Sequence, residues 1–153
     1  MRKRHRHIAL AGALALCSAA ALAQTTVKDA WVRGTVAQQK ATGAFMQITS
    51  AKGGKLVSVA SPAAGVVQIH EMKMSGDVMK MGAVPSLDLP AGTAVELKPG
   101  GYHVMMMDLK KPLQAGDSVP FTLVIEGKDG QRETLELTLP VRALGAAMSE
   151  HKP

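Results

Sequence analysis

The chain has 153 residues, and its 18 Lys and Arg against 12 Asp and Glu give a formal net charge of +6. Four of these basic residues lie within the first six positions, so the remainder carries 14 basic and 12 acidic residues. Because basic and acidic residues nearly balance in the remainder, the net charge of the whole chain does not indicate nucleic-acid binding. The roughly 130 residues that follow the N-terminal segment can bury one core as a single domain.

Residues 1–23 have the features of a cleaved secretory signal peptide. A basic start precedes an apolar run from Ile8 to Leu22, and the small residues Ala21 and Ala23 fit the cleavage site. The apolar run is shorter than the ~20 residues that a membrane-spanning helix needs, which argues against an anchor. We therefore predict cleavage after Ala23 and a periplasmic location, with no membrane attachment after cleavage.

The single cysteine, Cys17, lies in this N-terminal segment. A lipoprotein would be modified at Cys17, but Leu16 occupies the position where a lipobox has Gly or Ala, so this alternative is set aside. After cleavage the chain has neither a thiol nor a disulfide and must fold by burying a core. Nine methionines then stand beside only four aromatic residues, an unusual ratio for a β-rich domain.

From Val27 onward, short runs rich in Val, Ile, Leu, Thr and Met alternate with clusters of Gly, Pro, Asp and Ser. This pattern predicts an all-β sandwich, and no stretch has a sustained helical period. The domain is predicted over 24–143, and the unpatterned tail at 144–153 is predicted to be flexible. The predicted strands span 27–35, 43–49, 55–61, 66–74, 78–84, 94–97, 103–109, 118–126 and 131–141.

Histidine and methionine recur at even spacing on three of the predicted strands. Side chains alternate across a strand, so residues two apart share a face. The turn at 75–77 joins the first two of these strands as a hairpin, which brings their methionines together. The residues grouped by this parity are His70, Met72 and Met74 on the first strand, Met79 and Met81 on the second, and His103, Met105 and Met107 on the third.

Core packing is the alternative explanation for each methionine taken singly. Met is apolar and adaptable, and its burial stabilises a fold by roughly 1.5–3 kcal/mol. Met106 must point to the opposite side of its strand from Met105, so we expect Met106 in the core. Trp31 is also expected in the core. Tyr102 is expected to face away from the side that His103 occupies.

Taken together, the His and Met residues match the preferences of Cu(I). This soft cation binds thioether sulfur, which binds zinc and hard cations poorly, and imidazole adds a stronger donor. A thiolate would bind Cu(I) more tightly, but in an oxidising compartment it is open to oxidation and disulfide formation. A neutral, thiol-free Cu(I) site therefore suits the predicted periplasmic location.

The spacing of these residues resembles that of the PCuA(C) periplasmic copper chaperones. Their motif is His, ten residues, Met, twenty-one residues, then His-x-Met, and every position is matched here. The segments 97–105 and 113–121 also resemble the family, and the resemblance covers Val27 to about Arg142. The residues at the four motif positions are His70, Met81, His103 and Met105.

The resemblance implies a cupredoxin-like, Greek-key sandwich with an exposed site in which these four residues bind one Cu(I). It also implies delivery of copper to the CuA centre of cytochrome c oxidase or to another copper chaperone. Some relatives carry a long tail that binds additional copper, whereas this tail has only Met148 and His151, so no second strong site is expected there. The sequence leaves open whether additional copper binds at Met72, Met74, Met79 or Met107.

Other functions are weighed against this one, and we expect a monomer without enzymatic activity. A blue-copper electron-transfer protein needs a Cys thiolate, which the cleaved chain lacks. No Ser, His and acid grouping points to an enzyme, and Glu71, Asp77, Asp88 and Glu96 are expected in turns or facing solvent. A periplasmic copper buffer or resistance protein would use the same ligands without a dedicated acceptor, and the sequence leaves that alternative open.

Overall fold

The computed structural model describes residues 24–143, which form ten β-strands. The predicted signal peptide at 1–23 and the predicted flexible tail at 144–153 lie outside the described residues. The described part of the chain contains no helix long and apolar enough to cross a membrane. The strands are β1 (Thr25–Arg33), β2 (Ala41–Ser50), β3 (Gly54–Ala60), β4 (Ala64–Ser75), β5 (Val78–Val84), β6 (Leu87–Leu89), β7 (Ala94–Leu97), β8 (His103–Leu109), β9 (Ser118–Gly127) and β10 (Arg132–Arg142).

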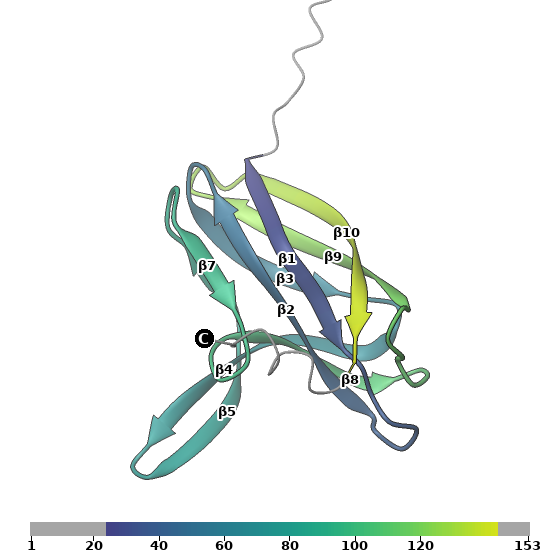
Figure 1. The fold of residues 1–153 in the computed structure, drawn as a ribbon. Helices are drawn as coiled ribbons and strands as arrows, with labels where there is room; N and C mark the ends of the chain where they lie inside the picture. The colour runs from purple at the N-terminus through teal and green to yellow at the C-terminus, as the bar shows by residue number, and fades with distance from the viewer. Residues whose placement is uncertain (1–23, 144–153) are drawn as a thin grey trace, which may run out of the picture.

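The strands form one hydrogen-bonded path in the order β5-β4-β8-β2-β1-β10-β9-β3-β6, with β7 also paired to β2. Among the described strands, every pair is antiparallel except the short contact between β1 and β10, where Val32 is opposite Val141. The two halves of the path lie in separate layers that meet at this contact (Figure 1). The all-β sandwich that the sequence predicts is therefore confirmed.

The core lies between the two layers and consists of the inward-facing residues of both. Met106 of β8 is fully buried there, so the parity argument for this residue is confirmed. Ile69 of β4 and Val104 of β8 pack into the same core. Strands β4 and β8, which carry three of the four predicted ligands, are thus anchored by their inner faces, and their outer faces are available for a site. Strand β5, which carries Met81, is exposed along almost its whole length.

Strand β2 has two partners along one edge. Strand β8 pairs with residues 41–44 and β7 with residues 46–49. Strand β8 also pairs with β4, and this pairing ends where His70 lies opposite His103. Beyond that point β4 pairs only with β5, so the end of the β4–β5 hairpin projects from the body as a two-stranded ribbon (Figure 1).

A bulge in β1 determines which face Trp31 occupies. The register with β2 shifts between Lys28 and Trp31, and Asp29 has a φ of 52°, in the left-handed region. The extra residue turns Trp31 to the outer face, opposite Phe45, while Val32 points into the core. Trp31 is buried, but on the outer face against Phe45 and not in the main core where it was expected.

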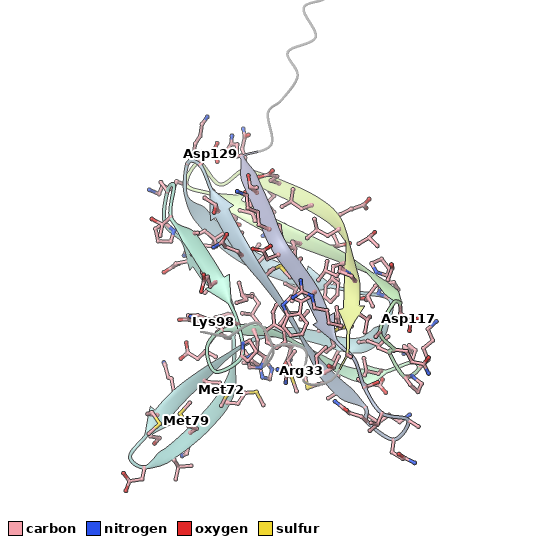
Figure 2. All side chains as sticks on the ribbon, in the orientation of Figure 1. Arg33, Met72, Met79, Lys98, Asp117 and Asp129 are labelled. Atoms are coloured by element: carbon pink, nitrogen blue, oxygen red, sulfur yellow. The ribbon has the colours of Figure 1, made fainter. Side chains whose placement is uncertain are left out.

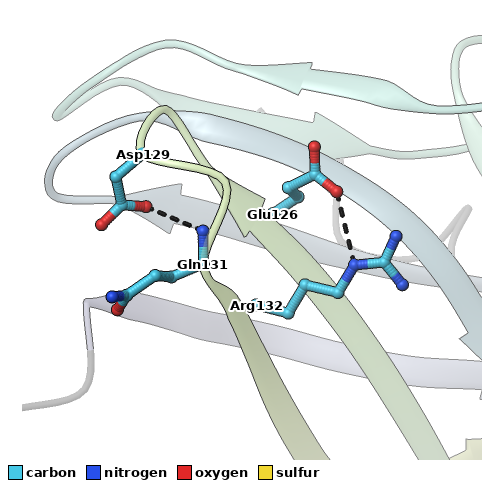
Figure 3. A network of polar contacts seen from close by, with 4 residues as sticks. All are labelled: Glu126, Asp129, Gln131 and Arg132. Atoms are coloured by element: carbon cyan, nitrogen blue, oxygen red, sulfur yellow. Dashed lines mark hydrogen bonds and ion pairs between the residues drawn. The ribbon is translucent and has the colours of Figure 1, made fainter.

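The turn between β9 and β10 lies at the end of the molecule opposite the projecting hairpin, as the labels of Asp129 and Met79 show (Figure 2). There the Asp129 carboxylate accepts a hydrogen bond from the backbone N–H of Gln131 at 3.0 Å (Figure 3). Nε of Arg132 lies 3.3 Å from Oε2 of Glu126, its cross-strand partner. Such solvent-accessible ion pairs contribute about 0–1 kcal/mol to stability, so this pair adds little to the fold.

Candidate metal centre

The four predicted ligands lie on three neighbouring strands, with His70 on β4, Met81 on β5, and His103 and Met105 on β8. His70 is directly opposite His103, and their ring centroids are 5.8 Å apart. Sδ of Met81 lies 3.1 Å from Nε2 of His103. Met105 follows His103 by two residues and shares its side of the strand. We call the surface that carries these four residues the site face.

An open cavity of about 340 Å³ lies on the site face, and Met72, Met81, His103 and Met105 are among its lining residues. Met72 is the cross-strand partner of Met81, and Figure 2 labels it on the hairpin. Met81 is 49% exposed, whereas His103 is 7% exposed. Three predicted ligands therefore share one cavity, while His70 lies beside it, against the ring of His103.

The backbone determines which nitrogen of His103 is available to a metal. Nδ1 of His103 lies 3.2 Å from the carbonyl oxygen of Gly101, so Nδ1–H donates to that carbonyl. The lone pair of Nε2 then faces Sδ of Met81, and two electron-pair donors point at one another. Metal-binding histidines typically donate their other ring N–H to a carbonyl or carboxylate in this way. Gly101 thus holds His103 in an orientation that leaves Nε2 free of a backbone partner among the described residues.

His70 presents its other nitrogen. Nε2 of His70 lies 2.9 Å from Oε1 of Gln68 and donates to it, because an amide oxygen can only accept. Nδ1 of His70 is buried and has no hydrogen-bond partner among the described residues. Burial, and secondarily the charge of His103, lower the pKa of His70 below its ordinary value of 6.5. His70 is thereby kept in the neutral form that can donate a lone pair.

The donor set selects among metals. Within residues 24–143, no three His, Cys, Asp or Glu side chains lie together in a way that could hold a metal ion. The site face instead offers two imidazoles and several thioethers, and the thioethers are uncharged, soft donors. Zinc sites are built from thiolate, imidazole and carboxylate, and calcium sites from oxygen, so neither fits this set. The set fits Cu(I).

Next to the cavity lies a layer of side chains that the sequence analysis did not identify as part of the site. The ring centroid of Phe45 is 6.4 Å from that of His103 and 4.7 Å from that of Trp31. The guanidinium of Arg33 lies 5.2 Å from the Phe45 centroid, and that of Arg142 lies 5.2 Å from the Trp31 centroid. Because Phe45 reaches His103 through the long-range β2–β8 pairing, no local sequence pattern could have identified it.

Tyr102 and Glu71 interact on the opposite face of the hairpin, as the parity of Tyr102 predicts. The nearby Glu71 carboxylate raises the pKa of the Tyr102 hydroxyl. Nζ of Lys73 lies 2.5 Å from Oε1 of Glu71 and is the main reason that the Glu71 pKa is lowered. The expectation that Glu71 simply faces solvent is wrong, because its side chain is only 13% exposed and is held by these two partners.

The fold and the site define a class of protein, an all-β domain that presents imidazole and thioether groups from adjacent strands on an open face. The sequence profile described as "Putative lipoprotein LpqE-like" matches residues 25–141. The chain therefore belongs to the LpqE-like family.

Two sequence relatives are similar over much of the domain. "Putative lipoprotein Lxx21020" of Leifsonia xyli subsp. xyli is 33% identical over 129 residues, which cover 82% of this chain and 74% of that protein. "Uncharacterized protein RP573" of Rickettsia prowazekii is 32% identical over 102 residues, which cover 63% of this chain. The matched region is 56% of the Rickettsia protein, so the chain spans little more than half of that relative.

Solved structures share the fold. The solution structure of CuI-DR1885 from Deinococcus radiodurans is 34% identical with a TM-score of 0.61, covering 82% of this chain and 83% of that one. The apo-DR1885 structure is 31% identical with a TM-score of 0.59, covering 94% and 95%. The apo PCuAC domain from PmoF1 is 25% identical with a TM-score of 0.63, covering 78% and 94%. These likenesses confirm the cupredoxin-like fold and support the resemblance to PCuA(C) proteins.

Proposed function

We propose that this protein is a periplasmic metallochaperone that binds one Cu(I) through His70, Met81, His103 and Met105. The observation that carries the proposal is the approach of Met81 Sδ to His103 Nε2 at 3.1 Å, with His103 Nδ1 occupied by the Gly101 carbonyl. A soft cation is the partner that two such facing donors can share. Copper is the cargo of this protein rather than a permanent cofactor.

The relatives add support from outside the chain. DR1885, at 34% identity, has been solved in a form whose name includes CuI. The Leifsonia relative is named a lipoprotein, which agrees with a location in the cell envelope. For this chain we propose export by the segment 1–23 with cleavage before Gln24. The intact mass of protein recovered from the periplasm tests this cleavage, and a mass that retains Cys17 would contradict it.

The proposed acceptor is a site richer in thiolate, the CuA centre of cytochrome c oxidase. A neutral set of imidazoles and thioethers attracts Cu(I) less strongly than an anionic dithiolate, so transfer runs downhill without an energy source. Met81 is the most exposed of the four ligands and His103 is buried. An incoming thiolate therefore reaches the copper from the side of Met81, and Met81 is displaced before His103.

The experiment mixes the Cu(I)-loaded protein with a reduced, copper-free CuA domain, separates the two, and measures the copper in each. We expect most of the copper on the acceptor, arriving faster than free ion dissociates from the donor alone. The control acceptor carries Ser in place of its thiolate ligands and should take up no copper. Copper that remains with this protein for hours would favour a buffer or resistance protein without a dedicated acceptor.

A further inference from the structure

The projecting end of the β4–β5 hairpin carries a second pair of thioethers. Met74 is directly opposite Met79, two residues beyond the pair formed by Met72 and Met81. Because side chains alternate across a strand, all four methionines lie on the site face of the hairpin. Figure 2 labels Met72 and Met79 along the hairpin, with Met79 further from the body. The methionines thus form two successive cross-strand pairs that lead outward from His103.

Burial in the core does not account for the outer pair. Met74 is 64% exposed and Met79 is 47% exposed, whereas Met46 and Met106 are buried in the core. An alternating strand normally turns its apolar side toward a core. On this hairpin, one side carries the lysine pair Lys73 and Lys80, and the other carries the methionines. Both sides are exposed at the tip, so the methionines do not face a core.

The outer pair has the chemistry of a soft-metal site. Residues directly opposite each other in an antiparallel ladder have Cβ atoms about 4.5–5.5 Å apart. Each Met side chain has three rotatable bonds beyond its backbone and can turn its sulfur toward the partner. Two thioethers that converge in this way bind a soft monovalent cation and leave zinc, calcium and magnesium unbound. With no imidazole in the pair, the site binds more weakly than the one at His103.

We propose that Met74 and Met79 form a second, weaker Cu(I) site that loads the site at His103. This inference rests on the proposed function, because the two sites share one cargo. Two residues along a strand span about 7 Å, so the outer site lies one short step from Met72 and Met81. Since Met81 faces His103 Nε2, copper bound at the tip passes to Met81 and then to His103 by exchange of one thioether at a time.

The test compares the wild-type protein, in the cleaved form that begins at Gln24 and so lacks Cys17, with the double variant Met74→Leu, Met79→Leu in the same form. Leucine keeps the apolar volume that could hold the hairpin together and removes only the sulfur. The matched control is Val78→Leu, which alters an exposed apolar residue at the same tip without touching a sulfur. Circular dichroism checks that all three proteins are folded. Each is titrated with Cu(I) without oxygen against a competing chelator, with methionine methyl groups labelled for NMR.

We expect the wild-type protein and Val78→Leu to bind two equivalents of Cu(I), the second more weakly. The methyl resonances of Met81 and Met105 should shift during the first equivalent, and those of Met74 and Met79 during the second. The double variant should lose the second equivalent, keep the affinity of the first, and take up copper from the chelator more slowly.

Three results would overturn the inference. The first is that the methyl resonances of Met74 and Met79 do not shift during the Cu(I) titration. The second is a double variant that retains the second equivalent, including the case in which Met148→Leu with His151→Ala removes it instead. The third is an unchanged rate of uptake by the double variant. A wild-type protein that fails to bind even the first equivalent would contradict the proposed function itself, and this outcome is distinct from the other three.

Discussion

Met105 and Met106 are neighbours in the chain with opposite surroundings. Met105 lines the cavity beside His103, whereas Met106 is fully buried in the core between the two layers. The two residues have the same side chain and differ only in where it lies. This makes them an internal comparison for separating metal binding from packing.

We predict that Met105→Leu lowers Cu(I) affinity at least ~10–100-fold, because even changes outside the ligand set cost that much in metal sites. Its effect on the free energy of unfolding should be under about 1.5 kcal/mol, since leucine conserves apolar volume. Met106→Ala should instead lower the free energy of unfolding by roughly 2–5 kcal/mol and leave the affinity nearly unchanged. Competition and denaturant titrations measure the two quantities. Equal losses of affinity in both variants would refute the assignment of the two faces.

The second prediction concerns the pH dependence of the metal-free protein. The pKa of His70 is lowered in the fold, mainly by burial and then by His103. The unfolded chain therefore binds a proton near pH 6.5 more readily than the native protein does. The stability that this group contributes is present above its unfolded pKa and is lost as the pH falls through its lowered folded pKa.

Denaturant titrations between about pH 7.5 and about pH 5.5 test this prediction, since the carboxylates remain ionised in that interval. We expect the free energy of unfolding of the wild-type protein to decrease with falling pH, and the variant His70→Gln to have a smaller slope. The control His151→Gln changes a histidine outside the described residues. Identical slopes for the wild-type protein and His70→Gln would show that the environment of His70 does not disfavour its charge.

At the residue scale, the alternation of side chains along a strand predicted much of the arrangement of the site from the sequence. Even spacing predicted that His103 and Met105 share a face and that Met106 does not, which needs only the period of a strand. The contacts of Gln68 with His70 and of Gly101 with His103 could not be predicted. They depend on side-chain rotamers and on the loop before β8, for which local sequence has no periodic signal.

At the scale of elements, Gly43 on β2 controls the shape of the cavity. Gly43 is directly opposite Met105, and a β-carbon at this position would lie 2.8 Å from Cζ of Phe45. The absence of a side chain therefore lets the Phe45 ring lie over β2, where it reaches both Trp31 and His103. Strand β2 thus shapes the site without supplying a ligand.

We predict that Gly43→Ala displaces the Phe45 ring and lowers the free energy of unfolding by roughly 1–3 kcal/mol, the usual cost of overpacking. Trp31 is the only tryptophan, so its fluorescence spectrum reports directly on its changed contact with Phe45. Cu(I) affinity should also decrease, because the new methyl group intrudes beside Met105. The matched control is Gly82→Ala on β5, where an added β-carbon meets nothing within 4 Å. Unchanged fluorescence in Gly43→Ala would contradict the prediction.

The strands themselves were largely predictable, and the exceptions have physical reasons. All nine predicted strands are present, with small differences at their ends. Strand β6, Leu87–Leu89, was missed because three residues are too few to establish an alternation, and its pairing with β3 supplies the register. The bulge at Asp29 was also not predicted, because an unusual φ at a single residue does not change the pattern of apolar and polar residues.

At the scale of the whole molecule, the fold and the site are separate in space. The core holds inner-face residues from both layers, while the four proposed ligands lie on the outer face. We therefore expect the metal-free protein to remain folded, unlike small zinc domains that unfold without their metal. The proposed ligands nevertheless lie on strands that differ in how many neighbours they pair with. Strand β8 has a paired strand on each side, whereas the outer part of the hairpin has only two strands. Isolated two-stranded ribbons are marginally stable in water.

The last prediction is that Cu(I) stabilises the β4–β5 hairpin more than the rest of the molecule. Met81 lies on the unsupported part of the hairpin and faces His103 on β8, so a metal bound to both ties the hairpin to the sheet. At a free Cu(I) concentration of 100 times Kd, local openings that break the site become about 100-fold rarer. Openings of β9 and β10 that leave the site intact should be unaffected. Amide hydrogen exchange of the metal-free and loaded proteins measures both regions, and the loaded variant Met81→Leu, which keeps His103 and Met105, should lack the added protection of the hairpin. Equal slowing of exchange in the hairpin and in β9–β10 would mean that copper stabilises the fold as a whole and does not act by tying β5 to β8.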